Sequence, residues 1–210
     1  MPSLLDDHTT KYLWQQVQNV DSYENAAQSF WHHIYTKSVF VDKQYIVDYE
    51  VPPIPEEQGK RKVDQVVKEV NSNWGVAFVL IFHEIKRNEI PIAELEYVEN
   101  QAFNACESYC HKYNIKQVYA QTSVGSRARF FKWTPGTWSP VDGQALGLFT
   151  AYMEFGDPAG ETYILRWLQY FKDQGVTTPQ ITWEWDPTRQ KHFYRTPANF
   201  MYQDGTMVKR

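Results

Sequence analysis

The run Val76-Ala-Phe-Val-Leu-Ile-Phe-His-Glu-Ile-Lys86 decides the fold, because it is apolar at every position before its last four residues. Side chains alternate between the two faces of a strand, so an unbroken apolar run predicts a strand that is buried on both faces. We therefore expect a central strand over residues 75–86, in a sheet with helices on both sides. Strict alternation would place Leu80 on the same face as Phe78 and Phe82.

The segments on either side of this run predict the neighbouring elements. Valine-rich or alternating runs between turn residues predict strands over residues 44–51, 62–70, 117–123 and 127–133. Apolar positions that recur every three or four residues predict helices over residues 22–37 and 94–113. Asp21 or Ser22 would supply the N-cap of the first helix. The expected fold class is α/β, a mixed central sheet flanked by helices in the order α-β-β-β-α-β-β.

The two ends of the chain carry fewer signals. Residues 1–20 are polar with scattered apolar positions. Beyond residue 134 the chain is loop-like until Asp157-Pro158, a capping residue followed by proline, opens a helix over residues 158–174. Residues 181–185 are a candidate strand, and the tail that follows has no clear pattern. We expect a single domain over residues 1–210, with a core over 22–133 and a helical, aromatic-rich extension over 134–210 packed on it.

Charge limits the classes of function. The formal net charge is −4 and charged residues make up 22% of the chain, so we expect no broad basic surface. Any contact with nucleic acid has to come from a local patch. The N-terminal residues lack the features of a secretory signal, and no apolar run is long enough to span a bilayer. We expect an intracellular protein, nuclear or cytoplasmic, with no membrane partner.

Aromatic residues make up 16% of the chain, including eight tryptophans, and could serve as stacking platforms for bases. Most of them fall at core-facing spacings, so packing is the expected role of the majority. Cys106 and Cys110 lie four residues apart in a predicted helix, without a set of residues at zinc-ligand spacing. We expect them to be buried thiols.

Three charged residues stand out from the apolar strands. Glu84 and Lys86 lie two apart at the end of the central strand, so they share one face. Asp64 lies among valines in the preceding strand, where a carboxylate without partners would be costly. If the two strands are neighbours, the three groups converge.

This set suits phosphodiester hydrolysis. Two carboxylates can hold Mg²⁺ or Mn²⁺, and the ion polarises the phosphate and lowers the pKa of bound water. The ammonium of Lys86 would hold the attacking water or stabilise the charge that develops on the phosphate. Asp64, Glu84 and Lys86 are therefore the candidate catalytic residues.

These residues resemble the PD-(D/E)XK, or restriction-endonuclease-like, nucleases. The matching residues are Val63-Asp64 and Glu84-Ile85-Lys86, with Val63 in the place of the proline of the name. The resemblance implies an α-β-β-β-α-β core in which Asp64, Glu84 and the Ile85 carbonyl bind Mg²⁺ or Mn²⁺. It implies Lys86 as the catalytic lysine and a nucleic acid as the partner, with DNA favoured over RNA.

The resemblance extends to two further positions. Some branches place a glutamine near the active site, on the helix after the triplet, and Gln101, on the buried stripe of the predicted helix, is the candidate for that catalytic role. An acidic residue on the first helix would be Glu24. Residues 98–106 and 119–129 are also similar to fungal proteins that carry this nuclease-like domain. The resemblance covers residues 22–133 and leaves the last third of the chain unassigned.

Three other residues have two interpretations each. Arg127 and Arg129 follow the turn at Gly125-Ser126, where they could hold phosphates of a nucleic acid or form an ordinary solvated strand face. His83 lies on the opposite face from Glu84, so we expect a packed, hydrogen-bonded histidine and no metal ligand.

Three functions remain open from the sequence. The intact Asp64, Glu84 and Lys86 set favours a metal-dependent nuclease. The net negative charge favours a catalytically inactive nuclease-like domain that binds nucleic acid or protein. An unrelated α/β module that binds a small ligand would require an apolar pocket and a displaced Asp64. The sequence leaves the oligomeric state open, a dimer included.

Overall fold

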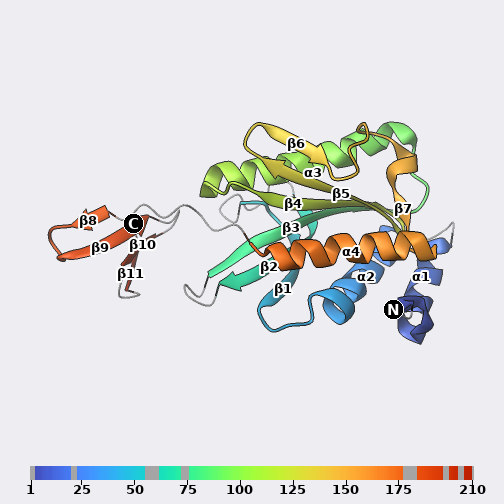
Figure 1. Ribbon diagram of the computed structural model, residues 1–210, viewed down its shortest axis with the longest axis horizontal. Coiled ribbons are helices and arrows are strands. Elements are labelled where there is room, and N and C mark those ends of the chain that lie inside the picture. The colour runs from blue at the N-terminus through green and yellow to red at the C-terminus, as the bar shows by residue number, and fades with distance from the viewer. Residues whose placement is uncertain are drawn as a thin grey trace.

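A seven-stranded mixed sheet forms the centre of the computed structural model (Figure 1). The structure describes residues 3–19, 23–54, 62–71, 76–176, 184–195, 199–202 and 206–209. Six strands follow one another across the sheet: β1 (Tyr45–Val51), β2 (Val63–Asn71), β3 (Val76–Lys86), β4 (Val118–Val124), β5 (Arg127–Thr134) and β6 (Thr137–Pro140). The seventh strand, β7 (Met153–Glu154), pairs with β5. The β3/β4 pair is parallel and the other pairs are antiparallel.

Helices cover both faces of the sheet, as the two-sided apolar strand predicted (Figure 1). One face packs on α2 (Glu24–Ile34), its continuation η2 (Tyr35–Val39) and α4 (Pro158–Gln174), with α1 (His8–Gln18) beside α2. The other face packs on α3 (Ile92–Tyr113). Two short 3₁₀ turns, η1 (Leu4–Asp6) and η3 (Phe149–Ala151), complete the main body. The α/β class and the order α-β-β-β-α-β-β are confirmed.

A β-bulge in β3 changes one expected orientation. Val67 pairs with Ile81, but the next residue of β2, Lys68, pairs with Val79, so Leu80 has no cross-strand partner. Leu80 therefore packs with Ile81 on the face of α2 and α4. The prediction that Leu80 shares a face with Phe82 was wrong, because the extra residue interrupts the alternation.

Other differences lie at the ends of the chain. Helix α1 was not predicted; its N-cap is Asp7, whose side chain accepts a hydrogen bond from the Thr10 N–H at 2.7 Å. The N-cap of α2 is Tyr23, and the predicted caps Asp21 and Ser22 lie outside the described residues. The prediction that α4 begins after Asp157 with proline in its first turn is confirmed.

A second sheet lies apart from the main body (Figure 1). It contains four antiparallel strands: β8 (Glu184–Asp186), β9 (Lys191–Arg195), β10 (Asn199–Tyr202) and β11 (Met207–Lys209). The sequence predicted only part of β8, and residues 181–183 of that candidate strand lie outside the described residues. Within residues 134–210, α4 packs into the core of the main body, whereas the second sheet stands away from it (Figure 1).

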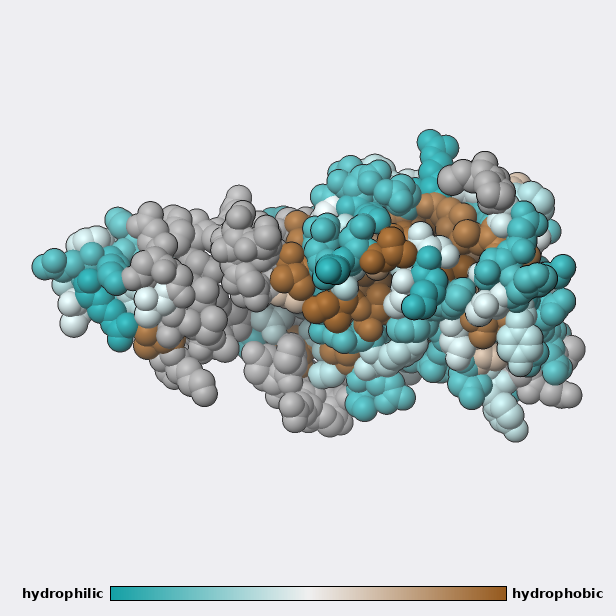
Figure 2. All heavy atoms as spheres, turned by 90° about the horizontal axis from the view of Figure 1, so that it is seen from below, coloured by the Kyte–Doolittle hydropathy of each residue, from teal (hydrophilic) through white to brown (hydrophobic). Residues whose placement is uncertain are grey.

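Apolar residues reach the surface in the middle of the main body, framed by hydrophilic residues (Figure 2). None of the described helices is both long and apolar enough to cross a membrane. Cys106 and Cys110 are free and buried, as predicted. Most ring contacts lie within the two cores, which agrees with a packing role for the majority of aromatic residues.

Candidate functional site

The strand register brings the two predicted metal ligands together. Gln65 pairs with His83 in the antiparallel β2/β3 ladder, so one further step along both strands places Asp64 opposite Glu84 on the same face. Opposed positions in such a ladder have Cβ atoms about 5 Å apart. The Oδ2 atom of Asp64 accepts a hydrogen bond from the Ile85 N–H at 2.6 Å, which fixes the carboxylate against the end of β3.

Lys86 and Glu24 complete the group. The Nζ atom of Lys86 lies 3.8 Å from Oδ2 of Asp64 and 3.7 Å from Oε2 of Glu24. Glu24 is the first residue of α2, so the helix on the other face of the sheet reaches the same point. All three side chains are partly exposed, so solvent has access to them. We refer to Glu24, Asp64, Glu84 and Lys86 as the strand-end cluster.

The electrostatics of Glu24 reflect this arrangement. Burial is the main reason that the pKa of Glu24 is raised above its usual value. The Lys86 ammonium acts in the opposite sense, and the Asp64 carboxylate raises the pKa further. The three groups are therefore close enough to influence one another's charge.

Glu84 lies deeper than the rest of the cluster, with 2% of its surface exposed. It pairs with Thr122 of β4, which in turn pairs with Arg129 of β5, in a row that faces α3. Burial raises the pKa of the Cys106 thiol on α3, and the charge of Glu84 contributes to that shift. Glu84 therefore lies beneath α3, within electrostatic reach of that helix.

Gln101 lies on α3, which packs against β3 and β4. Its Oε1 atom is buried and has no hydrogen-bond partner among the described residues. A buried amide oxygen without a partner costs about 1–3 kcal/mol. Water or a ligand that donates a hydrogen bond to this oxygen would remove the cost. Gln101 therefore stays a candidate residue of the site at the strand-end cluster.

The Asp64 and Glu84 carboxylates would suit a metal ion that keeps much of its water. Within the described part of the chain, no three Asp, Glu, His or Cys side chains are grouped so that they could hold a metal ion. However, Mg²⁺ at phosphate-processing sites is commonly bound through one or two carboxylates, with water and substrate phosphate in the other positions. Asp64 and Glu84 fit that mode and do not fit a closed structural site. Ile85 has a buried side chain, so only its backbone could take part.

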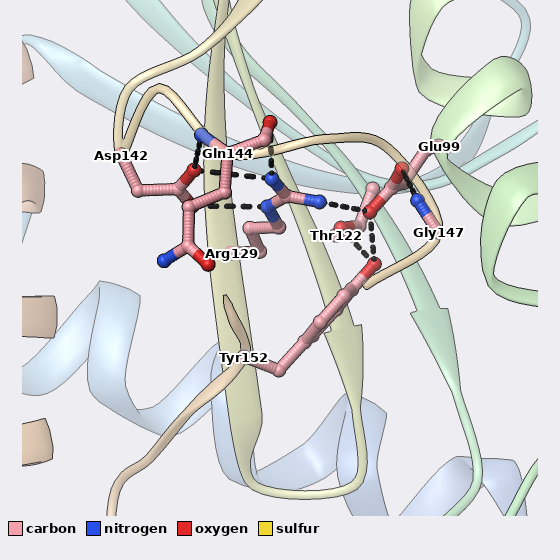
Figure 3. Close-up of polar contacts among 7 residues, drawn as sticks. All are labelled: Glu99, Thr122, Arg129, Asp142, Gln144, Gly147 and Tyr152. Carbon is pink, nitrogen blue, oxygen red and sulfur yellow. Dashed lines mark hydrogen bonds and ion pairs between the residues drawn. The ribbon is translucent and has the colours of Figure 1, made fainter. Parts of the chain in front are cut away.

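Arg129 is fully buried and joins the loop after β6 to α3 through hydrogen bonds and ion pairs (Figure 3). Its Nη1 donates to Glu99 at 2.9 Å, while Nε and Nη2 each donate to one carboxylate oxygen of Asp142 at 3.0 Å. Nη2 also donates to the Gln144 carbonyl at 3.0 Å, and the Tyr152 hydroxyl donates to Glu99 at 3.2 Å. The sequence left open whether Arg129 holds phosphates or forms a solvated strand face, but its guanidinium is buried and bonded within the protein.

Arg127 is the predicted arginine that remains at the surface. Its Nε lies 3.3 Å from Oε2 of Glu154, and its guanidinium carbon lies 5.4 Å from the centre of the Phe149 ring. Lys86 pairs with Val124, and Val124 pairs with Arg127. Arg127 therefore lies two strands from Lys86, on the same face and at the same end of the sheet.

A buried polar row on the opposite face was only partly foreseen. Gln65, His83 and Gln121 are neighbours across β2, β3 and β4. His83 Nδ1 lies 3.0 Å from the Tyr35 hydroxyl and Nε2 lies 2.8 Å from Oγ of Ser123, so the prediction of a hydrogen-bonded His83 is confirmed. The Tyr35 hydroxyl donates to Oε1 of Gln121 at 2.8 Å. The signal in the sequence was a polar residue within each strand: Gln65 among the valines of β2, His83 after the apolar run of β3, and Gln121 in β4.

Comparison of the chain with protein-family models, curated proteins and solved structures finds no match. The resemblance to the PD-(D/E)XK nucleases therefore rests on the strand-end cluster and on the element order.

Proposed function

We propose that this protein is a metal-dependent nuclease that hydrolyses phosphodiester bonds at the strand-end cluster. The observation that supports this most is the convergence of Asp64 of β2 with Glu84 and Lys86 of β3, at the end of β3 that follows its apolar run over residues 76–82. Charged groups in such a place cost folding free energy, so their presence there favours a chemical role. The small-ligand alternative required a displaced Asp64, whereas Asp64 lies opposite Glu84.

Each residue has a defined role in this proposal. Asp64 and Glu84 would hold Mg²⁺ or Mn²⁺, which would supply polarisation of the phosphate and a lower pKa of water at the site. Lys86 stabilises the negative charge that develops on the phosphate and orients the attacking water. When Asp64 binds the ion, the Glu24 carboxylate remains an ion-pair partner of Lys86. Glu24 therefore keeps the ammonium group directed at the site.

The test is cleavage of single- and double-stranded DNA and of RNA by the purified full chain, with Mg²⁺, with Mn²⁺ and with a chelator. We expect metal-dependent cleavage that is abolished by Glu84→Gln and by Lys86→Met. Lys68→Met is the matched control, because Lys68 pairs with Asp48 at 2.7 Å on β1 and β2, outside the cluster. Equal cleavage by the wild type and Glu84→Gln would show that a contaminant is responsible.

The second candidate is a nuclease-like domain that binds nucleic acid or a protein without cleaving it. The absence of a three-ligand metal group among the described residues favours it, as does the net charge of −4. Failure of every substrate to be cleaved, with nucleic-acid binding that needs no metal, would support this candidate over the nuclease.

A further inference from the structure

An exposed tyrosine flanks the strand-end cluster on the side of α2. Tyr23 is the N-cap of α2 and 80% of its surface is exposed. The next residue, Glu24, has its carboxylate 3.7 Å from Lys86 Nζ. An aromatic ring left in water forgoes the burial that stabilises most aromatic side chains. Tyr23 therefore offers an uncovered ring within one residue of the cluster.

A second aromatic surface lies on the side of β5. Phe149 is 37% exposed, and the guanidinium of Arg127 lies over its ring. Phe149 also stacks on Tyr152, with ring centres 6.3 Å apart and planes inclined by 20°. The Tyr152 hydroxyl is fixed by Thr122 at 2.8 Å and by Glu99 at 3.2 Å. Arg127 and Phe149 thus form a layered surface on a rigid base, which we call the Arg127–Phe149 platform.

Lys86 lies between these two aromatic surfaces. Glu24 is its neighbour on one side, and the Lys86–Val124–Arg127 row leads to the platform on the other. Adjacent strands are about 4.8 Å apart, so the backbones of Lys86 and Arg127 are about 10 Å apart. Two cations and two rings along one sheet end suit a polymer that alternates phosphates with planar bases.

We infer that the substrate of the strand-end cluster is single-stranded nucleic acid, with one base stacked on Tyr23 and another on the Arg127–Phe149 platform. This inference rests on the proposed function. In a duplex the bases are paired and stacked on one another, so neither ring would have a base to contact. The net charge of −4 also disfavours a protein that follows duplex phosphates over a long distance.

The inference is tested by binding without turnover. The Glu84→Gln protein is titrated, in the presence of a chelator, into fluorescein-labelled single-stranded DNA and RNA and into the matching duplexes, with anisotropy as the readout. We expect single strands to bind at least about tenfold more tightly than duplexes. On that background, Tyr23→Ala and Phe149→Ala should each weaken binding about five- to tenfold, while Phe149→Trp should retain it.

Trp185→Ala is the matched control, because Trp185 is 53% exposed on β8 and the sheet that contains β8 lies far from the β7 end of the main sheet (Figure 1). It should leave binding unchanged. Duplexes that bind as tightly as single strands, alanine variants without effect, or an equal loss from Trp185→Ala would each overturn the inference.

Failure of the single-strand inference can be distinguished from failure of the proposed nuclease function. If the wild type cleaves duplexes and the aromatic variants bind normally, the nuclease proposal stands and the single-strand assignment fails. If no substrate is cleaved but single strands bind through Tyr23 and Phe149, the stacking surfaces stand and the nuclease proposal fails.

Discussion

The Nζ atom of Lys86 lies 3.8 Å from Oδ2 of Asp64, and the same oxygen accepts the Ile85 N–H at 2.6 Å. The carboxylate is therefore held by a backbone donor, while the lysine is a looser neighbour at ion-pair distance. A metal ion that binds Asp64 would compete with the lysine and not with the backbone. Replacing Asp64 and replacing Lys86 should consequently have different effects on metal binding.

Under the proposed function, Asp64→Asn should weaken Mn²⁺ binding by about tenfold or more, because it would remove a charged ligand. Lys86→Met should leave Mn²⁺ binding unchanged or make it tighter, because it removes a cation that competes for Asp64. Both variants should lose activity. Isothermal titration calorimetry with Mn²⁺ measures the affinities, and an equal loss of affinity in both variants would contradict these roles.

Arg129→Met should lower the free energy of unfolding by about 3–5 kcal/mol, because it leaves the carboxylates of Glu99 and Asp142 without their shared cation. Desolvation acts to lower the pKa of Arg129, but its hydrogen bonds and ion pairs with Asp142 and Glu99 outweigh this and raise the pKa. The guanidinium therefore stays charged inside the protein. Denaturation in urea, followed by circular dichroism, gives the free energy of unfolding.

Arg127→Met is the control for this substitution. The Arg127 side chain is partly exposed and pairs with Glu154 at 3.3 Å, so its loss should cost no more than about 1 kcal/mol. Equal destabilisation by the two substitutions would show that burial is not the reason that Arg129 contributes to the free energy of unfolding.

His83 should make the protein sensitive to acid. Burial holds the pKa of His83 well below its usual value of 6.5, so below that pH the unfolded chain takes up a proton that the folded protein does not. Above about pH 6.5, protonation of His83 therefore does not reduce the free energy of unfolding. Below that pH, the free energy of unfolding falls by about 1.4 kcal/mol per pH unit until the pH reaches the pKa of His83 in the folded protein.

The measurement is the melting temperature of the wild type and of His83→Gln between pH 8 and pH 5. The amide of glutamine offers polar atoms to Tyr35 and Ser123 without a titratable proton. Carboxyl groups elsewhere titrate in both proteins, so the difference between the two curves isolates His83. Parallel curves would show that His83 is not the group responsible.

The sequence was sufficient to predict the central elements. The apolar run of β3 and the repeating apolar stripe of α3 each carry a strong local signal, because these elements bury large surfaces. The Asp157-Pro158 start of α4 was also visible. By contrast, α1 is short and buries only Thr10 and Val17, so few buried apolar positions mark it in the sequence.

The contacts that escaped prediction depend on residues distant in the sequence. The partners of Arg129 lie on α3 and in the loop after β6, and nothing near Arg129 in the sequence indicates that it is buried. The bulge at Leu80 reflects pairing with β2, which an alternating pattern within β3 does not reveal. Glu24, in contrast, was matched through the resemblance, and the structure places it beside Lys86.

Gly125 links the β4–β5 turn to the end of β3. Its N–H donates to the Lys86 carbonyl at 2.8 Å, and its carbonyl accepts from Nε1 of Trp31 at 2.8 Å. Its φ angle is +60°, and an added Cβ would lie 3.0 Å from Oδ1 of Asn88. Gly125→Ala would therefore strain the turn and press on the residues that follow Lys86.

Gly125→Ala should lower the free energy of unfolding by more than Gly136→Ala. Gly136 has a φ angle of +75° with no atom within 4 Å of an added Cβ, so its substitution reports the backbone strain alone, about 1 kcal/mol. The additional loss at Gly125 measures the close contact with Asn88. Because Gly125 binds the Lys86 carbonyl, Gly125→Ala should also reduce any cleavage activity, and Gly136→Ala should not. Urea denaturation and the nuclease assay provide the two readouts, and equal effects of the two substitutions on both would show that Gly125 does not position Lys86.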